Sequence, residues 1–154
     1  VRALTYVLTL GREGIPEAAK NAVLNANYMM KLLSEKYTMA YAGPCMHEFV
    51  MCLQDLKDAT GCSAMDIAKG LLDHGIHPPT MYFPLIVHEA LMIEPTETES
   101  QETMDEVCGV FLHLWDVAHS APQTLHDAPT RTPVRRLDEV GAARNPVLRY
   151  TPHD

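Results

Sequence analysis

Residues 63–80 read SAMDIAKGLLDHGIHPPT and contain the best-marked helix of the chain. Ser63, followed three residues later by Asp66, predicts a capping box, in which both side chains satisfy backbone N–H groups at the start of a helix. Gly75 predicts the end of the helix, because glycine readily adopts the left-handed conformation that closes one, and Ile76 supplies the accompanying apolar contact. The side chains expected to face the core are Ile67, Ala68, Leu71 and Leu72. This stretch therefore predicts a buried helix in the middle of the chain.

Two further helices are predicted before it. Apolar residues at helical spacing predict a first helix over residues 1–10, which Gly11 ends. A second apolar stripe predicts a helix from Ile15 to about Lys36, with Pro16 in the first turn, where its missing N–H has no partner to lose. Small alanines along this stripe indicate that another element packs closely against the helix.

Two strands are predicted between these helices and the central one. They cover residues 37–42 and 46–53, and the second run alternates between two faces. The residues on its more apolar face are Phe49, Met51 and Leu53. We expect residues 58–61 to form a loop that leads into the central helix.

An edge segment, a strand and a long helix are predicted after the central helix. The prolines of residues 77–84 donate no hydrogen bonds to a sheet, so we expect an irregular or edge segment there. A short apolar strand follows at residues 90–93. The pair Thr98 and Gln101 predicts the start of a closing helix. Its apolar stripe consists of Met104, Val107, Cys108, Phe111, Leu114, Trp115 and Ala118.

The chain changes character after Ala121, because five of the eleven prolines fall in the last 33 residues. Such a tail, with one short helix expected over 135–140, is either mobile or laid along another surface. We expect three parts, namely a helical segment (1–36), an α+β domain (37–121) and an extended tail (122–154). Since strands and helices alternate without a regular βαβ rhythm, the domain is predicted to be a small mixed or antiparallel sheet with helices on one face.

Composition argues against two classes of partner. Twelve basic and twenty acidic residues give a net charge of −8, whereas non-specific nucleic-acid binding needs Lys and Arg at the phosphates. No run approaches the roughly 20 apolar residues of a membrane-spanning helix. The four cysteines are scattered through apolar surroundings, so we expect free thiols in a reducing cytoplasm. The chain starts at Val1 inside a helical pattern, and we expect it to be a piece of a longer protein.

Cysteines and histidines raise the possibility of a metal site or a reactive thiol. Cys45, His47 and Cys52 lie close together in sequence, and His74 and His77 are three residues apart. Neither set has the paired spacing of a structural zinc site, and no second histidine completes a zinc-protease helix. We therefore expect no metal site, with buried thiols and surface histidines as the simpler interpretation.

Two groups of residues remain as candidates for binding. His77 and Thr80 stand on a stretch that two prolines stiffen, and Glu94 follows the last predicted strand, where it could face a cleft. A rigid connection with an exposed His77 is an equally good interpretation. In the tail, Arg131, Arg135 and Arg136 could pair with carboxylates or a phosphate of a partner, or form a solvated basic patch.

Several of these segments resemble one enzyme family. Residues 70–85 and 91–99, with their His-Pro-Pro-Thr and Glu-Pro-Thr-Glu motifs, look like the C-terminal region of the glycine-cleavage P-protein, in its β-subunit (subunit 2) form. Residues 22–28, 43–50 and 132–139 look like the same family. The resemblance runs nearly end to end, and the two motifs at this spacing are specific.

The resemblance implies the small C-terminal domain of a fold-type-I pyridoxal-phosphate enzyme. In the family, glycine and the lipoylated H-protein give an aminomethylated H-protein and carbon dioxide, with the cofactor as electron sink. The family's cofactor lysine follows a histidine, and no His-Lys pair occurs in this chain. The lysines present are Lys20, Lys31, Lys36, Lys57 and Lys69. The isolated chain is therefore expected to bind no cofactor and to be inactive, although it belongs to an enzyme.

The resemblance also implies roles and partners. His77 and Thr80 are expected to shape a channel for glycine or the lipoyl arm, and Glu94 to brace that segment by hydrogen bonding. The tail, with its three arginines, is expected to lie against the α subunit of a bacterial, cytoplasmic heterotetramer of two α and two β subunits. The isolated chain is expected to form a homo-oligomer, because large exposed apolar patches seek partners. The alternative is a free-standing, non-catalytic module for binding or oligomerisation.

Overall fold

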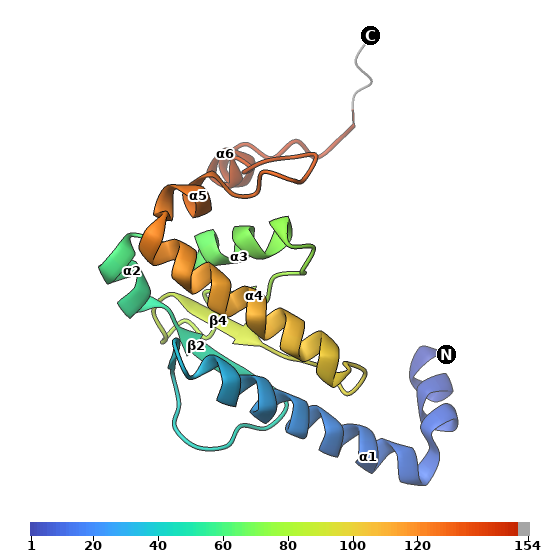
Figure 1. The fold of residues 1–154 in the computed structure, drawn as a ribbon. Helices are drawn as coiled ribbons and strands as arrows, with labels where there is room; N and C mark the ends of the chain where they lie inside the picture. The colour runs from blue at the N-terminus through green and yellow to red at the C-terminus, as the bar shows by residue number, and fades with distance from the viewer. Residues whose placement is uncertain (151–154) are drawn as a thin grey trace.

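The computed structural model describes residues 1–150, which form a mixed α+β fold with four strands and six helices (Figure 1). The helices are α1 (Arg2–Leu33), α2 (Gln54–Thr60), α3 (Ala64–Asp73), α4 (Gln101–Ser120), α5 (Pro122–Asp127) and α6 (Glu139–Arg144). The strands are β1 (Thr38–Met39), β2 (Phe49–Cys52), β3 (Thr80–Met81) and β4 (Ala90–Ile93). The predicted α+β class is confirmed. Residues 151–154, which include Pro152 of the predicted tail, lie outside the described residues.

The sheet is antiparallel throughout, with strand order β1-β2-β4-β3. Phe49 lies opposite Ile93 and Met51 opposite Leu91, and these four side chains join one core with apolar residues of α1, α3 and α4. The other two residues of β2 are half-buried, as expected when side chains alternate along a strand. The predicted alternation of this strand is confirmed, and α4 lies across the sheet in Figure 1.

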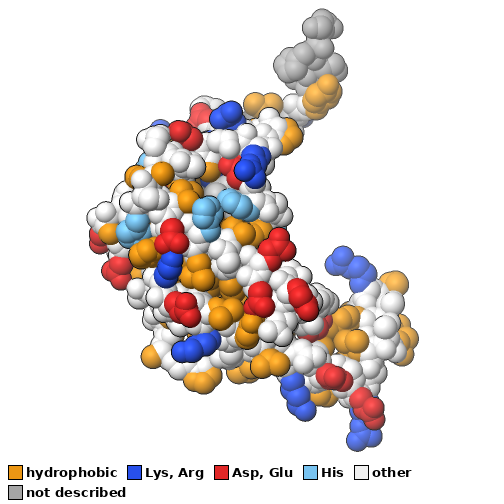
Figure 2. Space-filling model, in the orientation of Figure 1, with side chains coloured by type: hydrophobic (Ala, Val, Ile, Leu, Met, Phe, Trp, Pro, Cys, Tyr) orange, Lys and Arg blue, Asp and Glu red, His pale blue; other side chains and the backbone are white. Residues whose placement is uncertain are grey.

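Helix α1 is broken at Gly11, whose φ of 65° and ψ of −166° are not helical. The predicted stop at Gly11 is therefore confirmed, although the second part ends at Leu33 rather than near Lys36. Residues 2–10, which we call the N-terminal arm, leave the axis of the second part of α1 at a sharp angle (Figure 1), and the Tyr6 hydroxyl donates to the Glu97 carboxylate at 3.2 Å. Leu4 and Leu8 on the arm are 63% and 73% exposed, and Figure 2 shows a group of hydrophobic side chains there.

Helix α3 has both of its predicted caps. The Ser63 side chain accepts from the Asp66 N–H, and the Asp66 carboxylate accepts from the Ser63 N–H at 2.7 Å. At the other end, Gly75 has a φ of 75°, and the N–H of Ile76 donates to the Leu71 carbonyl at 3.0 Å. This pattern closes the helix and fixes the direction in which the chain leaves toward residue 77.

The buried face of α3 is larger than predicted, because Ala64, Asp66 and Gly70 are buried beside Ile67, Ala68 and Leu71. Leu72 is only half-buried, whereas Gly70 is buried. A Cβ atom at Gly70 would lie 3.0 Å from a methyl carbon of Leu114 and 3.2 Å from one of Leu125. The missing side chain therefore lets α4 and α5 approach α3 closely.

Two local predictions in the middle of the chain were wrong. Residues 58–61 were expected to be a loop, but most of them belong to α2, a helix with one buried side chain, Leu56, and too short to show an apolar period. Helix α4 starts after Ser100, whose side chain accepts from the Thr103 N–H at 3.2 Å. Thr98 does not cap it, because the Thr98 hydroxyl is hydrogen-bonded to that of Thr96 at 2.7 Å.

The chain after α4 returns over α3. The short helix predicted over residues 135–140 lies instead at α6, where the Asp138 side chain accepts from the Gly141 N–H at 2.8 Å. Before it, Asp73 of α3 accepts from the N–H groups of Thr130 and Arg131, both at 2.7 Å. Residues 128–136, which we call the clamped segment, are thus laid along this chain's own surface.

None of the helices within residues 1–150 has the length and apolar character needed to span a bilayer.

Candidate functional site

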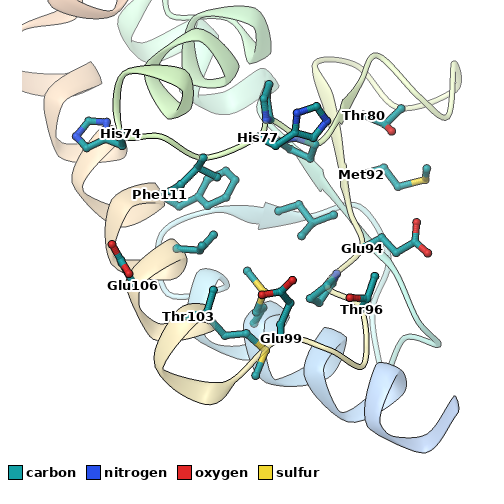
Figure 3. Close-up of a pocket in the computed structure, with 18 of the residues that line it drawn as sticks. His74, His77, Thr80, Met92, Glu94, Thr96, Glu99, Thr103, Glu106 and Phe111 are labelled. Atoms are coloured by element: carbon teal, nitrogen blue, oxygen red, sulfur yellow. The ribbon is translucent and has the colours of Figure 1, made fainter. Parts of the chain in front are cut away.

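A pocket of about 630 Å³ opens between the segment that follows α3, the end of β4 and the first half of α4 (Figure 3). Its volume lies within the range of about 300–1,000 Å³ that small-molecule sites usually have. His77, Thr80 and Glu94, which the sequence singles out, all line it. Two segments that are distant in sequence therefore contribute to one site.

Each of the three candidate residues is positioned by a different helix or strand. His77 is exposed just beyond the glycine cap of α3, and Thr80 begins β3, where it lies opposite Met92 of β4. Glu94 follows the last residue of β4. Figure 3 shows Thr80, Met92 and Glu94 on one side of the pocket and His74 on the other.

The pocket has an apolar floor and a polar rim. The apolar lining residues are Met29, Ile76, Met92, Ile93, Met104, Val107 and Phe111. The glutamates of the rim are Glu94, Glu99 and Glu106. No lysine or arginine lines the pocket within residues 1–150, so its electrostatic potential disfavours anionic ligands.

Glu94 does not brace the His77–Thr80 segment in the way we predicted. Its Oε1 lies 4.0 Å from Nε2 of His47, and His47 lies 3.9 Å from the Glu48 carboxylate. Within residues 1–150, no hydrogen bond joins Glu94 to residues 77–80. Antiparallel pairing explains the arrangement, because Phe49 opposite Ile93 brings the residues just beyond these strand ends together.

Two asparagines of α1 hold the loops around the site, and the sequence reasoning did not select them. The Asn25 side-chain amide donates to the carbonyls of Thr96 and Glu99 at 2.9 and 3.3 Å. The Asn27 amide donates to the Cys45 carbonyl at 2.8 Å and accepts from the Cys45 N–H at 3.0 Å. A signal was present, because asparagine is disfavoured inside helices unless its side chain has another partner.

The three candidate arginines lie away from the pocket. The Arg136 guanidinium donates to Asp66 at 2.6 Å and to the carbonyls of Ala128 and Leu125 at 2.7 and 2.8 Å. The Arg131 backbone is bound to Asp73, as described above. The Arg135 residue is exposed, and no ion pair of its side chain is found within residues 1–150. Two of the three arginines therefore serve to anchor the clamped segment.

The pocket does not fit pyridoxal phosphate. Its lining has neither a lysine for the aldehyde nor a cationic side chain for the phosphate. Three of the five lysines form ion pairs elsewhere on the surface. These pairs are Lys36–Asp116, Lys57–Glu89 and Lys69–Glu139. None of these three lysines lines the pocket.

Burial makes three of the four thiols less reactive. All four cysteines are free, and burial raises the pKa of Cys45 and Cys62. Burial, with a smaller effect of the nearby Asp105 charge, raises the pKa of Cys108 to about 12. These three thiols are therefore protonated near neutral pH and poor nucleophiles. No group of three or more metal-ligating side chains is found in this part of the chain.

Comparison with known proteins identifies the family. The family described as "Glycine dehydrogenase, C-terminal domain" matches residues 18–131, from α1 beyond the kink to the clamped segment. The chain is 59% identical over 150 residues to the "Probable glycine dehydrogenase (decarboxylating) subunit 2" of Treponema denticola, and 53% identical over 150 residues to the protein of that name from Thermosipho africanus. Each match covers 97% of this chain and 31% of the relative, so the chain spans about a third of these relatives' length. The chain belongs to the glycine dehydrogenase C-terminal domain family.

Proposed function

We propose that this chain is the C-terminal domain of subunit 2 of a two-subunit glycine decarboxylase, the P-protein of a glycine cleavage system. The supporting observation is the 59% identity to a subunit named for this activity, which extends over 97% of the chain. The reaction of the complete enzyme takes glycine and the lipoylated H-protein to an aminomethylated H-protein and carbon dioxide. The relatives give no support to a free-standing, non-catalytic module.

In this proposal, residues outside this chain hold the cofactor of the complete enzyme. The pocket lining supports this placement of the cofactor, because the pocket has no lysine and its rim carries three carboxylates. Pyridoxal phosphate supplies the electron sink for decarboxylation when it is bound to the complete enzyme. The domain by itself is then inactive and contributes one wall of the site.

The wall that the domain contributes to the complete active site is the pocket described above. His77 and Thr80 shape the channel that admits glycine or the lipoyl arm, and Glu94 lies at the same rim. The apolar floor suits the hydrocarbon chain of a lipoyl arm, and the volume of about 630 Å³ is larger than glycine needs.

The partners of the domain are the α subunit, in a heterotetramer of two α and two β subunits, and the lipoylated H-protein. The exposed N-terminal arm supports a contact with further protein, since exposed apolar patches mark interaction sites. Arg135 is exposed, and no ion pair of its side chain is found within residues 1–150, so it is available for a contact with the α subunit. The division into residues 1–36, 37–121 and 122–154 separates the linking helices, the α+β domain and the tail. Free thiols and bacterial relatives support a place in the bacterial cytoplasm.

The test uses the full-length subunit that contains these residues, assembled with its α subunit and supplied with pyridoxal phosphate and lipoylated H-protein. Release of labelled carbon dioxide from carboxyl-labelled glycine measures the activity. Changing His77→Ala is expected to lower kcat/KM for the H-protein by about three- to tenfold, the effect of losing about one interaction at the site.

His88→Ala is the matched control, because His88 is also exposed but does not line the pocket. Equal activity of the two variants would remove the role proposed for His77. A complex that releases no carbon dioxide from glycine would overturn the function itself.

A further inference from the structure

Two polar side chains are buried within residues 1–150, and one of them belongs to α1. Asn25 is 8% exposed, and the other buried residue, Asp66, caps α3. Burying an amide is unfavourable unless hydrogen bonds replace its contacts with water. An asparagine in the middle of a helix is also a poor helix former. Both its burial and its helical position are unfavourable for an asparagine, so its hydrogen-bond partners must compensate for them.

The partners of Asn25 are two carbonyl groups of a single turn. Its Nδ2 donates to the Thr96 carbonyl at 2.9 Å and to the Glu99 carbonyl at 3.3 Å. The turn is closed by the Glu99 N–H, which donates to the Thr96 carbonyl at 3.4 Å. The two N–H groups of one amide nitrogen thus satisfy both carbonyls from α1.

This turn forms one edge of the pocket. Thr96 and Glu99 both line it, and the next residue, Ser100, caps α4, which supplies a further wall. Figure 3 shows the Glu99 side chain between those of Thr96 and Thr103. Within residues 1–150, no hydrogen bond or ion pair holds the Glu99 carboxylate, so the turn sets the point from which this exposed side chain reaches the pocket.

We infer that Asn25 is a positioning residue, which fixes the Thr96–Glu99 turn and thereby keeps Glu99 at the edge of the pocket, where its carboxylate can meet the incoming H-protein arm. This inference rests on the proposed function. Glu99 belongs to a rim without cationic groups, so its carboxylate favours neutral or cationic ligand groups over anionic ones. Without this role, the acidic residues 94–99 would be explained simply by the favourable interaction of carboxylates with the N-terminus of the following helix.

The first test replaces Asn25→Asp in the full-length subunit within its complex. The change keeps the shape of the side chain, but it sets a carboxylate oxygen against two carbonyl oxygens and so releases the turn. The KM for lipoylated H-protein is expected to rise by about three- to tenfold, as for the loss of about one hydrogen bond, while the KM for glycine stays the same. Asn21→Asp is the matched control, because it makes the same change at an exposed position one turn earlier on α1.

The second test is a double-mutant cycle with Glu99→Gln. If Asn25 acts through Glu99, Asn25→Asp adds little to the KM of a protein that already carries Glu99→Gln. Independent, additive effects in the cycle would overturn the inference. So would an unchanged KM for H-protein in a folded Asn25→Asp variant, or equal rises in both KM values.

A fold defect is separated from these outcomes by the melting temperature of each variant. If Asn25→Asp does not fold, Glu99→Gln alone decides, with the exposed Glu35→Gln as control, because an unchanged KM for H-protein in Glu99→Gln overturns the inference. An inactive parent complex overturns the proposed function together with the inference. An active parent complex with a folded, unaffected Asn25→Asp variant overturns the inference only.

Discussion

At the scale of single residues, Asp66 joins parts of the chain that are far apart in sequence. Its Oδ2 accepts from the N–H and the hydroxyl of Ser63, both at 2.7 Å. Its Oδ1 accepts from the Arg136 guanidinium at 2.6 Å and lies 3.5 Å from Nδ1 of His126. One carboxylate thus caps α3 and holds the clamped segment. The capping role could be predicted from the spacing of Ser63 and Asp66, but a partner 70 residues away could not.

These contacts give the stability of the protein a defined pH dependence. Burial raises the pKa of the Asp66 carboxyl, but the hydrogen bonds from Ser63 and the Arg136 charge outweigh it, and the pKa lies below the ordinary 3.8. A lowered folded-state pKa stabilises the fold fully above the unfolded value and loses this contribution as pH falls through the folded value. The free energy of unfolding is therefore expected to fall as pH drops below about 4.

Urea denaturation at a series of pH values measures this dependence. Asp66→Asn is expected to lower the free energy of unfolding near neutral pH by about 1–3 kcal/mol and to flatten its decline in acid. Asp127→Asn, at an exposed position of α5, is the control and should leave the curve in place. Parallel pH curves for the parent protein and Asp66→Asn would contradict the assignment.

At the scale of elements, the sequence predicts those whose signals are local. The cap at Ser63, the stop at Gly75, the break at Gly11 and the alternation of β2 are all encoded within a few residues. Helix α2 was not predicted, because a seven-residue helix with one buried side chain shows no apolar periodicity. The start of α4 was misplaced because several Ser and Thr residues stand before it, and only the structure shows which one caps.

Substitutions at two helical glycines distinguish the effect of close packing on stability from the effect of helix propensity. At Gly70 on α3, an added methyl group would press on Leu114 and Leu125, whereas at Gly109 on α4 nothing lies within 4 Å. Gly70→Ala is expected to destabilise the protein by about 1–3 kcal/mol through overpacking. Gly109→Ala is expected to stabilise it by about 0.5–1 kcal/mol, because alanine is the better helix former.

Thermal or urea unfolding of both variants checks the two signs together. The substitutions are chemically identical and both lie in helices, so each serves as the control for the other. A gain in stability at Gly70 would show that α3 can move away from α4 and α5 without loss.

At the scale of the whole molecule, the candidate site depends on contacts that no short stretch encodes. His77 and Glu94 were selected from separate motifs, and the pairing of β3 with β4 brings both to one pocket. The sequence could not reveal that Asn25 ties a third segment to the pocket, because Asn25 and Thr96 are 71 positions apart and nothing between them indicates their contact. Similarly, the tail arginines look free in the sequence, and two of them are bound to α3 in the fold.

The N-terminal arm bears on the assembly of the isolated chain. Leu4 and Leu8 are among its most exposed apolar residues, and their burial between chains would favour association by about 1.5–3 kcal/mol for each side chain. Leu4→Lys with Leu8→Lys is expected to shift the isolated chain toward the monomer in sedimentation velocity experiments. Leu137→Lys, at a residue 64% exposed in the tail, is the control. Identical sedimentation of all three proteins would show that the arm does not mediate association.

The two edges of the sheet limit another route of association. Strands β1 and β3, which form these edges, are two residues long each. An edge strand can act as a template for a strand of another chain only where it presents a row of unpaired backbone groups, and short edges present few of them. Growth of the sheet from molecule to molecule, the first step toward fibrous aggregates, is therefore disfavoured by the short length of β1 and β3.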